Sequence, residues 1–107
     1  MPYQILFADD AERDLEDLYL FPVRRDGVQT AERILSEIEE ACRGLQDFPD
    51  RGNVPKELVG LGITEYRELH HKPWRMIYRV VEKDVIIYCI MDGRRDMRSF
   101  LERRLLR

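Results

Sequence analysis

The sequence is poor in the residue types that usually mark catalysis by metals, thiols or phosphate-binding loops. Its two cysteines are Cys42, in an apolar helical pattern, and Cys89, in an apolar strand pattern, so we expect two small core residues and no disulfide. The two histidines, His70 and His71, have no cysteine or carboxylate at ligand spacing. No glycine-rich loop follows a strand, and neither a nucleophile motif nor a distinct pair of catalytic carboxylates is recognisable. The sequence therefore predicts neither a metal nor another cofactor.

Long apolar runs are also absent. None approaches the ~20 residues of a membrane-spanning helix, and residues 1–5 lack the basic stretch and the apolar region of a secretory signal. We therefore expect a cytoplasmic protein that does not contact the membrane. The 107 residues, 44% of them hydrophobic, suffice for one modest core, so residues 1–107 are predicted to form a single domain.

The net charge of -3 conceals an asymmetry along the chain. Residues 1–60 carry 7 basic and 14 acidic side chains, whereas residues 61–107 carry 11 basic and 7 acidic ones. Two interpretations stay open at this point. The folded protein has two faces of different potential, or its acidic helices are simply well solvated.

Two amphipathic helices are predicted after a short apolar strand at residues 3–7. In the first helix, Asp9 and Glu12 have the spacing of a capping box, and Pro22 should end or kink the helix. Residues 24–27 are then the connection. The apolar positions repeat with helical spacing in both segments: Ala11, Leu15, Leu18 and Tyr19 in the first, and Ala31, Ile34, Leu35, Ile38, Ala41, Cys42 and Leu45 in the second. The short link predicts an antiparallel helical hairpin.

The second half predicts three strands and a final helix. After a loop at Asn53–Gly62, strands are expected at about Thr64–His70, Trp74–Val81 and Val85–Asp92, and the tight polar connections between them predict an antiparallel meander. A last helix follows, with Met97, Leu101 and Leu105 on one side and a basic side that extends to Arg107. The element order predicts an α+β fold in which a layer of helices packs over a small sheet.

Several arginines lie at the ends of these strands and are candidate binding residues. Because side chains alternate along a strand, Arg75 and Arg79 should share the face that the hairpin leaves open, where Arg67 and Arg95 could approach Arg75. A guanidinium group stays charged and fits phosphate or carboxylate. The alternative is that these arginines form ion pairs with neighbouring acidic residues.

The start of the last helix is basic, which is unusual because helix N-termini favour anions. Arg94 and Arg95 are candidates for binding there, although Asp96 could cap the helix while both arginines point to water. Arg98 and Arg104 extend the basic surface. His70, or its neighbour His71, is a candidate general base beside these arginines; alternatively, both are simply polar residues at a turn.

These residues, in this order, resemble the RelE/ParE superfamily of bacterial toxins from type II toxin–antitoxin systems. The resemblance covers nearly the whole chain and rests on an ordered set of short motifs: Ala11-Glu12-Arg13-Asp14-Leu15, Leu45 with Phe48-Pro49 and Gly52, Tyr66-Arg67-Glu68-Leu69, Pro73 to Val80, and Asp92-Gly93-Arg94-Arg95-Asp96.

The resemblance implies a helical hairpin packed on a small curved antiparallel sheet. It also implies a toxin that is neutralised by a cognate antitoxin. RelE-like members cleave mRNA on the ribosome, and Arg67, Arg75 and Arg95 would then be catalytic, with His70 handling protons. ParE-like members instead inhibit DNA gyrase and would use the same basic surface to bind the target or the antitoxin. Leu69 stands near the position where RelE-like members have a lysine, and Phe100 or Leu101 stands near the position of a tyrosine. None of these side chains transfers protons. We therefore expect a ParE-like gyrase inhibitor, with a RelE-like endoribonuclease as the alternative.

Overall fold

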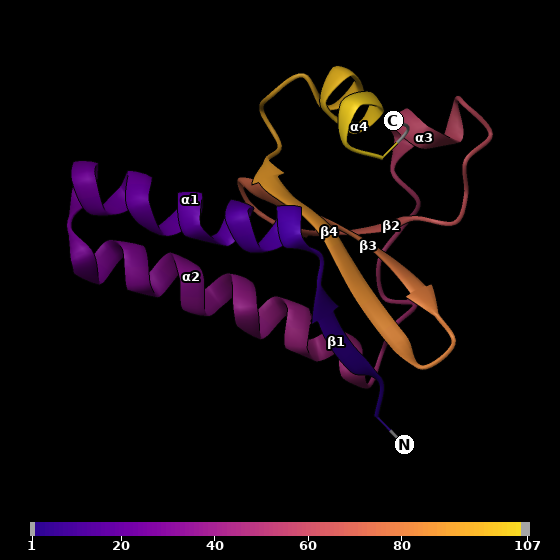
Figure 1. The fold of residues 1–107 in the computed structure, drawn as a ribbon, viewed down its shortest axis with the longest axis horizontal. Helices are drawn as coiled ribbons and strands as arrows, with labels where there is room; N and C mark the ends of the chain where they lie inside the picture. Colours follow the sequence, from indigo (N-terminus) through magenta and orange to yellow (C-terminus); the bar gives the residue numbers. More distant parts are fainter. Residues whose placement is uncertain (1, 106–107) are drawn as a thin grey trace.

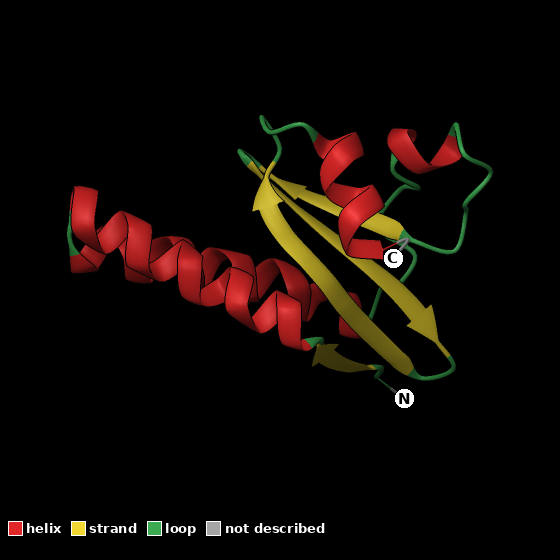
Figure 2. Cartoon of the chain, turned by 45° about the horizontal axis from the view of Figure 1, so that its top comes forward, coloured by secondary structure: helices red, strands yellow, loops and turns green. Residues whose placement is uncertain are grey.

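A computed structural model describes residues 2–105; the expectation for Arg107 lies outside them. A long helical hairpin packs against one side of a twisted sheet, and two shorter helices lie on its other side (Figures 1 and 2). The elements in chain order are β1 (Gln4–Phe7), α1 (Asp9–Asp26), α2 (Val28–Arg43), the 3-10 turn η1 (Gly44–Gln46), α3 (Lys56–Val59), β2 (Arg67–His71), β3 (Trp74–Val81), β4 (Asp84–Asp92) and α4 (Met97–Leu105). The predicted α+β architecture is confirmed.

The sheet has the strand order β1-β4-β3-β2. Its last three strands form the predicted antiparallel meander. However, β1 runs parallel to β4, with Ile5 opposite Val85, so the sheet is mixed and the expectation of a purely antiparallel sheet is wrong. Parallel neighbours need a crossover connection. Here the helical hairpin lies between the two strands in the sequence and covers one face of the sheet.

The helices of the hairpin differ from the predicted ones at two points. The residue before α1 is Ala8, and no side chain caps the helix, so the predicted Asp9 capping box does not form. Pro22 does not end α1, which continues to Asp26. Gly27 alone connects the helices, with φ 96°, a conformation that favours glycine. Its N–H donates to the carbonyls of Pro22 and Val23, so the end of the helix is set by Gly27 rather than by the proline.

The larger core lies between the hairpin and the sheet. Buried side chains from both layers form it, namely Ala11, Leu18, Ile38, Cys42, Leu45, Leu69, Met76, Tyr78, Val85, Ile87 and Ile90. Burial raises the pKa of the Cys42 thiol to about 12, so this cysteine is an inert core residue, as the sequence predicted.

A second core covers the opposite face of the sheet, which the sequence predicted to be open. There α3 and α4 pack over β3 and β4, and the buried side chains are Leu58, Ile77, Cys89, Met91, Met97 and Leu101. Cys89 is fully buried, and its pKa is likewise raised to about 12 by burial. The expectation that this face stays open around its arginines is therefore wrong, because apolar side chains on both short helices bury it.

Among the described residues, no helix is both long enough and apolar enough to cross a membrane.

Candidate functional site

Arg75 is the centre of a buried ion-pair network and is not accessible to a ligand. It belongs to β3, and its Nε donates to Glu68 Oε2 of β2 at 3.0 Å. Its Nη1 and Nη2 donate to the two carboxylate oxygens of Glu57 in α3 at 3.0 and 2.9 Å. The Arg75 side chain is only 9% exposed, and those of Glu57 and Glu68 are 13% and 4% exposed. The expectation that a ligand reaches Arg75 is wrong, because two carboxylates already occupy its guanidinium group.

The same network contacts His70, and it shifts the pKa values of Glu57 and Arg75. The bond from Arg75 holds the pKa of Glu57 below its usual range, and Glu57 in turn raises the pKa of Arg75. Glu68 Oε1 contacts His70 Nε2 and also accepts from Asn53 Nδ2 at 3.3 Å. One ring nitrogen of His70 is thus engaged in the network, although half of its side chain is exposed.

Arg67 lies on the other face of the sheet. Its cross-strand partner is Tyr78, a residue of the larger core, and paired residues share a face. Arg67 Nη1 donates to the carbonyl of Gly52 at 2.7 Å and to that of Asp50 at 3.4 Å, so the side chain anchors the loop before α3. The expected approach of Arg67 to Arg75 is therefore wrong.

Arg95, Arg94 and Arg79 are exposed, as the sequence predicted. Arg95 lies over the ring of Phe100, 5.4 Å from its centroid. Arg94 forms an ion pair with Asp92 and lowers the pKa of that carboxyl. Neither Arg94 nor Arg95 forms an ion pair with the network of Arg75.

Of the two candidate binding arginines in α4, Arg104 is bound within the fold and Arg98 is exposed. Arg104 donates to both oxygens of Asp14 at 3.0 and 3.1 Å and to the carbonyl of Tyr88, which ties α4 to α1. Arg98 is exposed and lies 3.6 Å from Glu102 in the same helix. Asp96 accepts from the N–H of Ser99 and so caps α4, the alternative given for it above.

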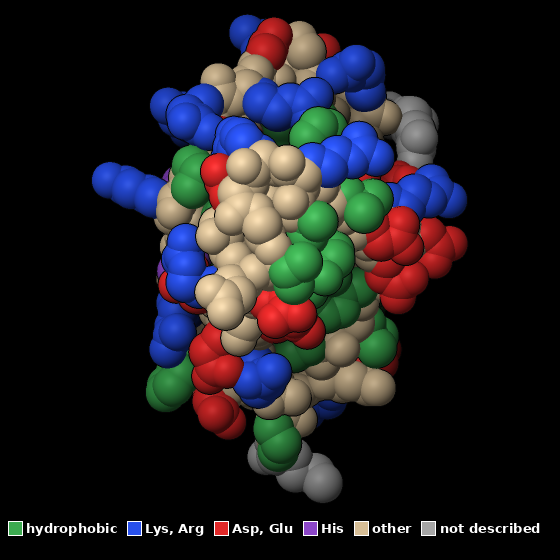
Figure 3. Space-filling model, turned by 90° about the vertical axis from the view of Figure 1, so that its left-hand side faces the viewer, with side chains coloured by type: hydrophobic (Ala, Val, Ile, Leu, Met, Phe, Trp, Pro, Cys, Tyr) green, Lys and Arg blue, Asp and Glu red, His purple; other side chains and the backbone are tan. Residues whose placement is uncertain are grey.

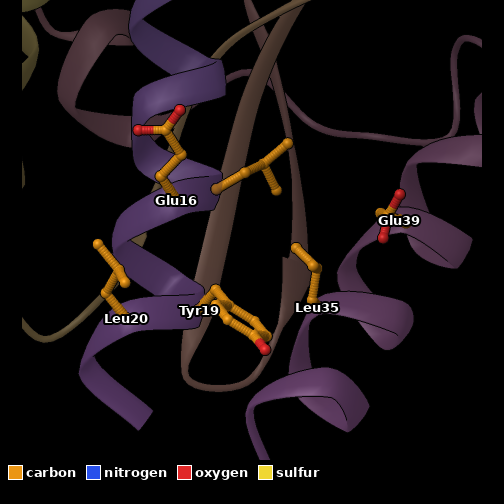
Figure 4. A pocket seen from close by; sticks show the side chains of 6 residues that line it. Glu16, Tyr19, Leu20, Leu35 and Glu39 are labelled. Carbon is orange, nitrogen blue, oxygen red and sulfur yellow. The ribbon is translucent and has the colours of Figure 1, made fainter. Parts of the chain in front are cut away.

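An apolar groove lies between the two helices of the hairpin. It has a volume of about 460 Å³, and its lining residues are Leu15, Glu16, Tyr19, Leu20, Leu35 and Glu39 (Figure 4). The helical period identified the lining residues Leu15, Tyr19 and Leu35 but assigned them to the core. Nothing in the sequence distinguished these half-exposed positions from fully buried ones. Glu57 was missed for a different reason, because no sequence spacing connects it with an arginine 18 positions away.

The comparisons with known proteins agree with this fold. A sequence model of the family described as "ParE toxin of type II toxin-antitoxin system, parDE" matches residues 5–97. Toxin ParE3 of Caulobacter vibrioides is 33% identical over 89 residues, which make up 82% of this chain and 84% of that protein.

Two solved structures share the fold. The structure titled "Chromosomal ParDE TA system from P. aeruginosa" has a TM-score of 0.72 and 24% identity, and the match covers 84% of this chain and 95% of that one. The toxin–antitoxin complex RelBE2 of Mycobacterium tuberculosis has a TM-score of 0.64 and 23% identity, covering 86% and 92%. These identities support the fold alone. The two sequence matches favour the ParE-like over the RelE-like interpretation, and the chain belongs to the ParE toxin family of type II toxin–antitoxin systems.

Proposed function

We propose that this toxin inhibits DNA gyrase by binding to it, without cleaving RNA, and that a cognate antitoxin neutralises it. One observation carries the choice of mechanism. The groups that an RNA-cleaving relative would gather around a phosphate do not converge here. Arg75 is neutralised by Glu57 and Glu68, and Arg67 lies on the opposite face of the sheet. Stabilising a phosphate transition state needs preorganised, unneutralised donors on one side of the scissile bond.

A pair of assays with purified components tests the mechanism. The toxin should inhibit supercoiling by gyrase and leave ribosome-bound mRNA intact. Cleaved mRNA with unaffected supercoiling would instead support the endoribonuclease alternative. In that case Arg95→Ala should abolish cleavage without unfolding the protein, because Arg95 is exposed and Arg75 is not.

The apolar groove of the hairpin is the proposed site for the antitoxin. Its apolar floor is bordered by Glu16 of α1 and Glu39 of α2, which Figure 4 shows on the two helices of the hairpin. An amphipathic antitoxin segment with apolar residues toward the groove and basic residues toward its borders would match it. Free antitoxins that are disordered and fold on binding can cover such extended surfaces. The ParDE and RelBE2 structures are named as toxin–antitoxin systems, which supports a partner of this kind.

The substitution Leu35→Arg tests this site, with Ser36→Arg as its control. Leu35 lines the groove, whereas the neighbouring Ser36 is exposed and does not. Loss of a central apolar contact costs about 2 kcal/mol or more, which corresponds to a Kd about 30-fold weaker. Calorimetry with the antitoxin should show this loss for Leu35→Arg only. Equal affinity of both variants would exclude the groove.

A further inference from the structure

Two loops meet at one end of the sheet and are held close together. The turn between β2 and β3 contains Lys72 and Pro73, and the loop after β4 begins with Gly93. The N–H of Gly93 donates to the carbonyl of Pro73 at 2.7 Å. A Cβ at Gly93 would lie 2.8 Å from Cδ of Arg75, so only glycine permits this close approach. The Arg75 side chain therefore lies directly against the loop that begins with Gly93.

The cations on these loops are exposed and lie between two clefts. Clefts of about 510 and 630 Å³ share the residues Lys72, Pro73, Trp74 and Arg94, so the paired loops form a ridge between them. Arg95 lines the smaller cleft from the same loop. Figure 3 shows Lys and Arg side chains gathered in the upper part of the face that it presents, above the helical hairpin.

Most acidic side chains that line the clefts are already paired within the fold. Asp92 pairs with Arg94, and Glu68 with Arg75. Two more pairs engage carboxylates of the hairpin: Glu37 with Arg33 and Asp14 with Arg104. Asp17 of α1 is the lining carboxylate without an ion pair in the described chain.

Two cations on the ridge are not neutralised in this way. Lys72 and Arg95 make no ion pair within residues 2–105, and the guanidinium group of Arg95 lies over the Phe100 ring. An arginine stacked on an aromatic ring keeps its donors free for a second partner. The N-terminus of α4 adds no anion site, because Asp96 already caps it. The uncompensated positive charge of this end therefore resides in side chains on a ridge.

We propose that this ridge, with Lys72 and Arg95 as its main contacts, binds the phosphate backbone of duplex DNA. Phosphates project from the outside of the double helix and can be reached by cations on a ridge, whereas a peptide is usually held in a groove. The site is local, so it is compatible with the chain's overall acidity. It goes beyond inhibition of gyrase, because the toxin would contact DNA with its own residues.

Fluorescence anisotropy with a labelled DNA duplex and the purified full-length toxin, in the absence of gyrase, tests the proposal. Binding should weaken linearly with the logarithm of the salt concentration. The double variant Lys72→Glu/Arg95→Glu should lower the magnitude of that slope by about 2. The control variant Arg43→Glu/Lys83→Glu changes the net charge equally at exposed sites elsewhere and should bind like the wild type.

Three outcomes would overturn the proposal: no binding by the wild type at low salt, an equal loss in both double variants, or displacement of DNA by polyglutamate at equal charge concentration. The first excludes a DNA site, the second reduces the effect to net charge, and the third identifies a general site for acidic segments. Because gyrase is absent from the assay, failure here leaves the supercoiling test intact as a separate result.

Discussion

Removal of the Arg75 side chain should destabilise the protein strongly. Arg75→Ala would leave Glu57 and Glu68 without their guanidinium partner at side-chain exposures of 13% and 4%. Breaking a buried ion pair by deleting one partner costs about 3 to 5 kcal/mol, since the remaining charge is desolvated and uncompensated. We expect the free energy of unfolding, measured by urea denaturation, to fall by this amount.

Two further variants separate the buried charge from general damage. Arg98→Ala removes an arginine whose ion pair with Glu102 is largely exposed, and its cost should stay within about 0.5 kcal/mol. Combining Arg75→Met with Glu57→Gln and Glu68→Gln removes the uncompensated charges, so this triple variant should be more stable than Arg75→Ala. A loss below about 1.5 kcal/mol for Arg75→Ala would refute the reasoning, since it would mean that the two carboxylates do not depend on Arg75.

The pH dependence provides an independent check on the same network. The Arg75 bond lowers the pKa of Glu57 in the folded state, so the unfolded state binds the proton more readily. The resulting stability is fully present above the unfolded pKa of a glutamate, about 4.3, and is lost as the pH falls through the lower folded value. The stability difference between wild type and Arg75→Ala should therefore shrink below about pH 4.3 and be constant near neutrality.

Three other predictions concern the loop before α3 and the last helix. Tyr78→Phe removes a hydroxyl that makes two hydrogen bonds with this loop, at 2.7 and 3.0 Å, and should cost about 1 to 3 kcal/mol in urea denaturation. Gly52→Ala would place a Cβ 2.7 Å from the Tyr78 hydroxyl and should lower stability by about 1 to 3 kcal/mol, whereas Gly60→Ala meets no atom within 4 Å and serves as its control. Arg104→Met removes the ion pair with Asp14, so amide exchange should accelerate in α4 but not in β3; unchanged exchange in α4 would contradict this.

The elements with strong local patterns were predictable from the sequence. Alternation and tight polar turns predicted the β2–β3–β4 meander, and helical spacing predicted both long helices. The alternation even placed Arg75 and Ile77 correctly on the face opposite the hairpin core. Local rules failed where tertiary structure decides. Pro22 lies buried inside α1, and the parallel pairing of β1 with β4 joins segments about 80 residues apart.

The site was harder to predict, because what covers a face is not encoded in the pattern of the strand that bears it. The helix α3 has four residues, too few for a recognisable period, yet it brings Glu57 to Arg75 and buries Leu58. A prediction that does not include α3 therefore leaves the face of the sheet that carries Arg75 uncovered. Likewise, Arg67 was expected near Arg75, but residues 67 and 70 have opposite parity in β2, and it is His70 that pairs with Arg75 in register.

Internal pairing also bears on the charge asymmetry along the chain. Acidic residues of the first half neutralise arginines of the second half, as Glu57 does for Arg75 and Asp14 for Arg104. The potential of the surface therefore depends on the cations that stay unpaired, and not on the charge totals of the two halves alone. A substitution at a paired arginine should then change the free energy of unfolding, whereas one at Arg95 should change association and leave stability nearly unaltered. Measuring the free energy of unfolding and the binding affinity for every arginine variant therefore separates arginines that bind a partner from arginines that stabilise the fold. A toxicity assay alone cannot separate them, because it responds to a loss of binding and to a loss of stability alike.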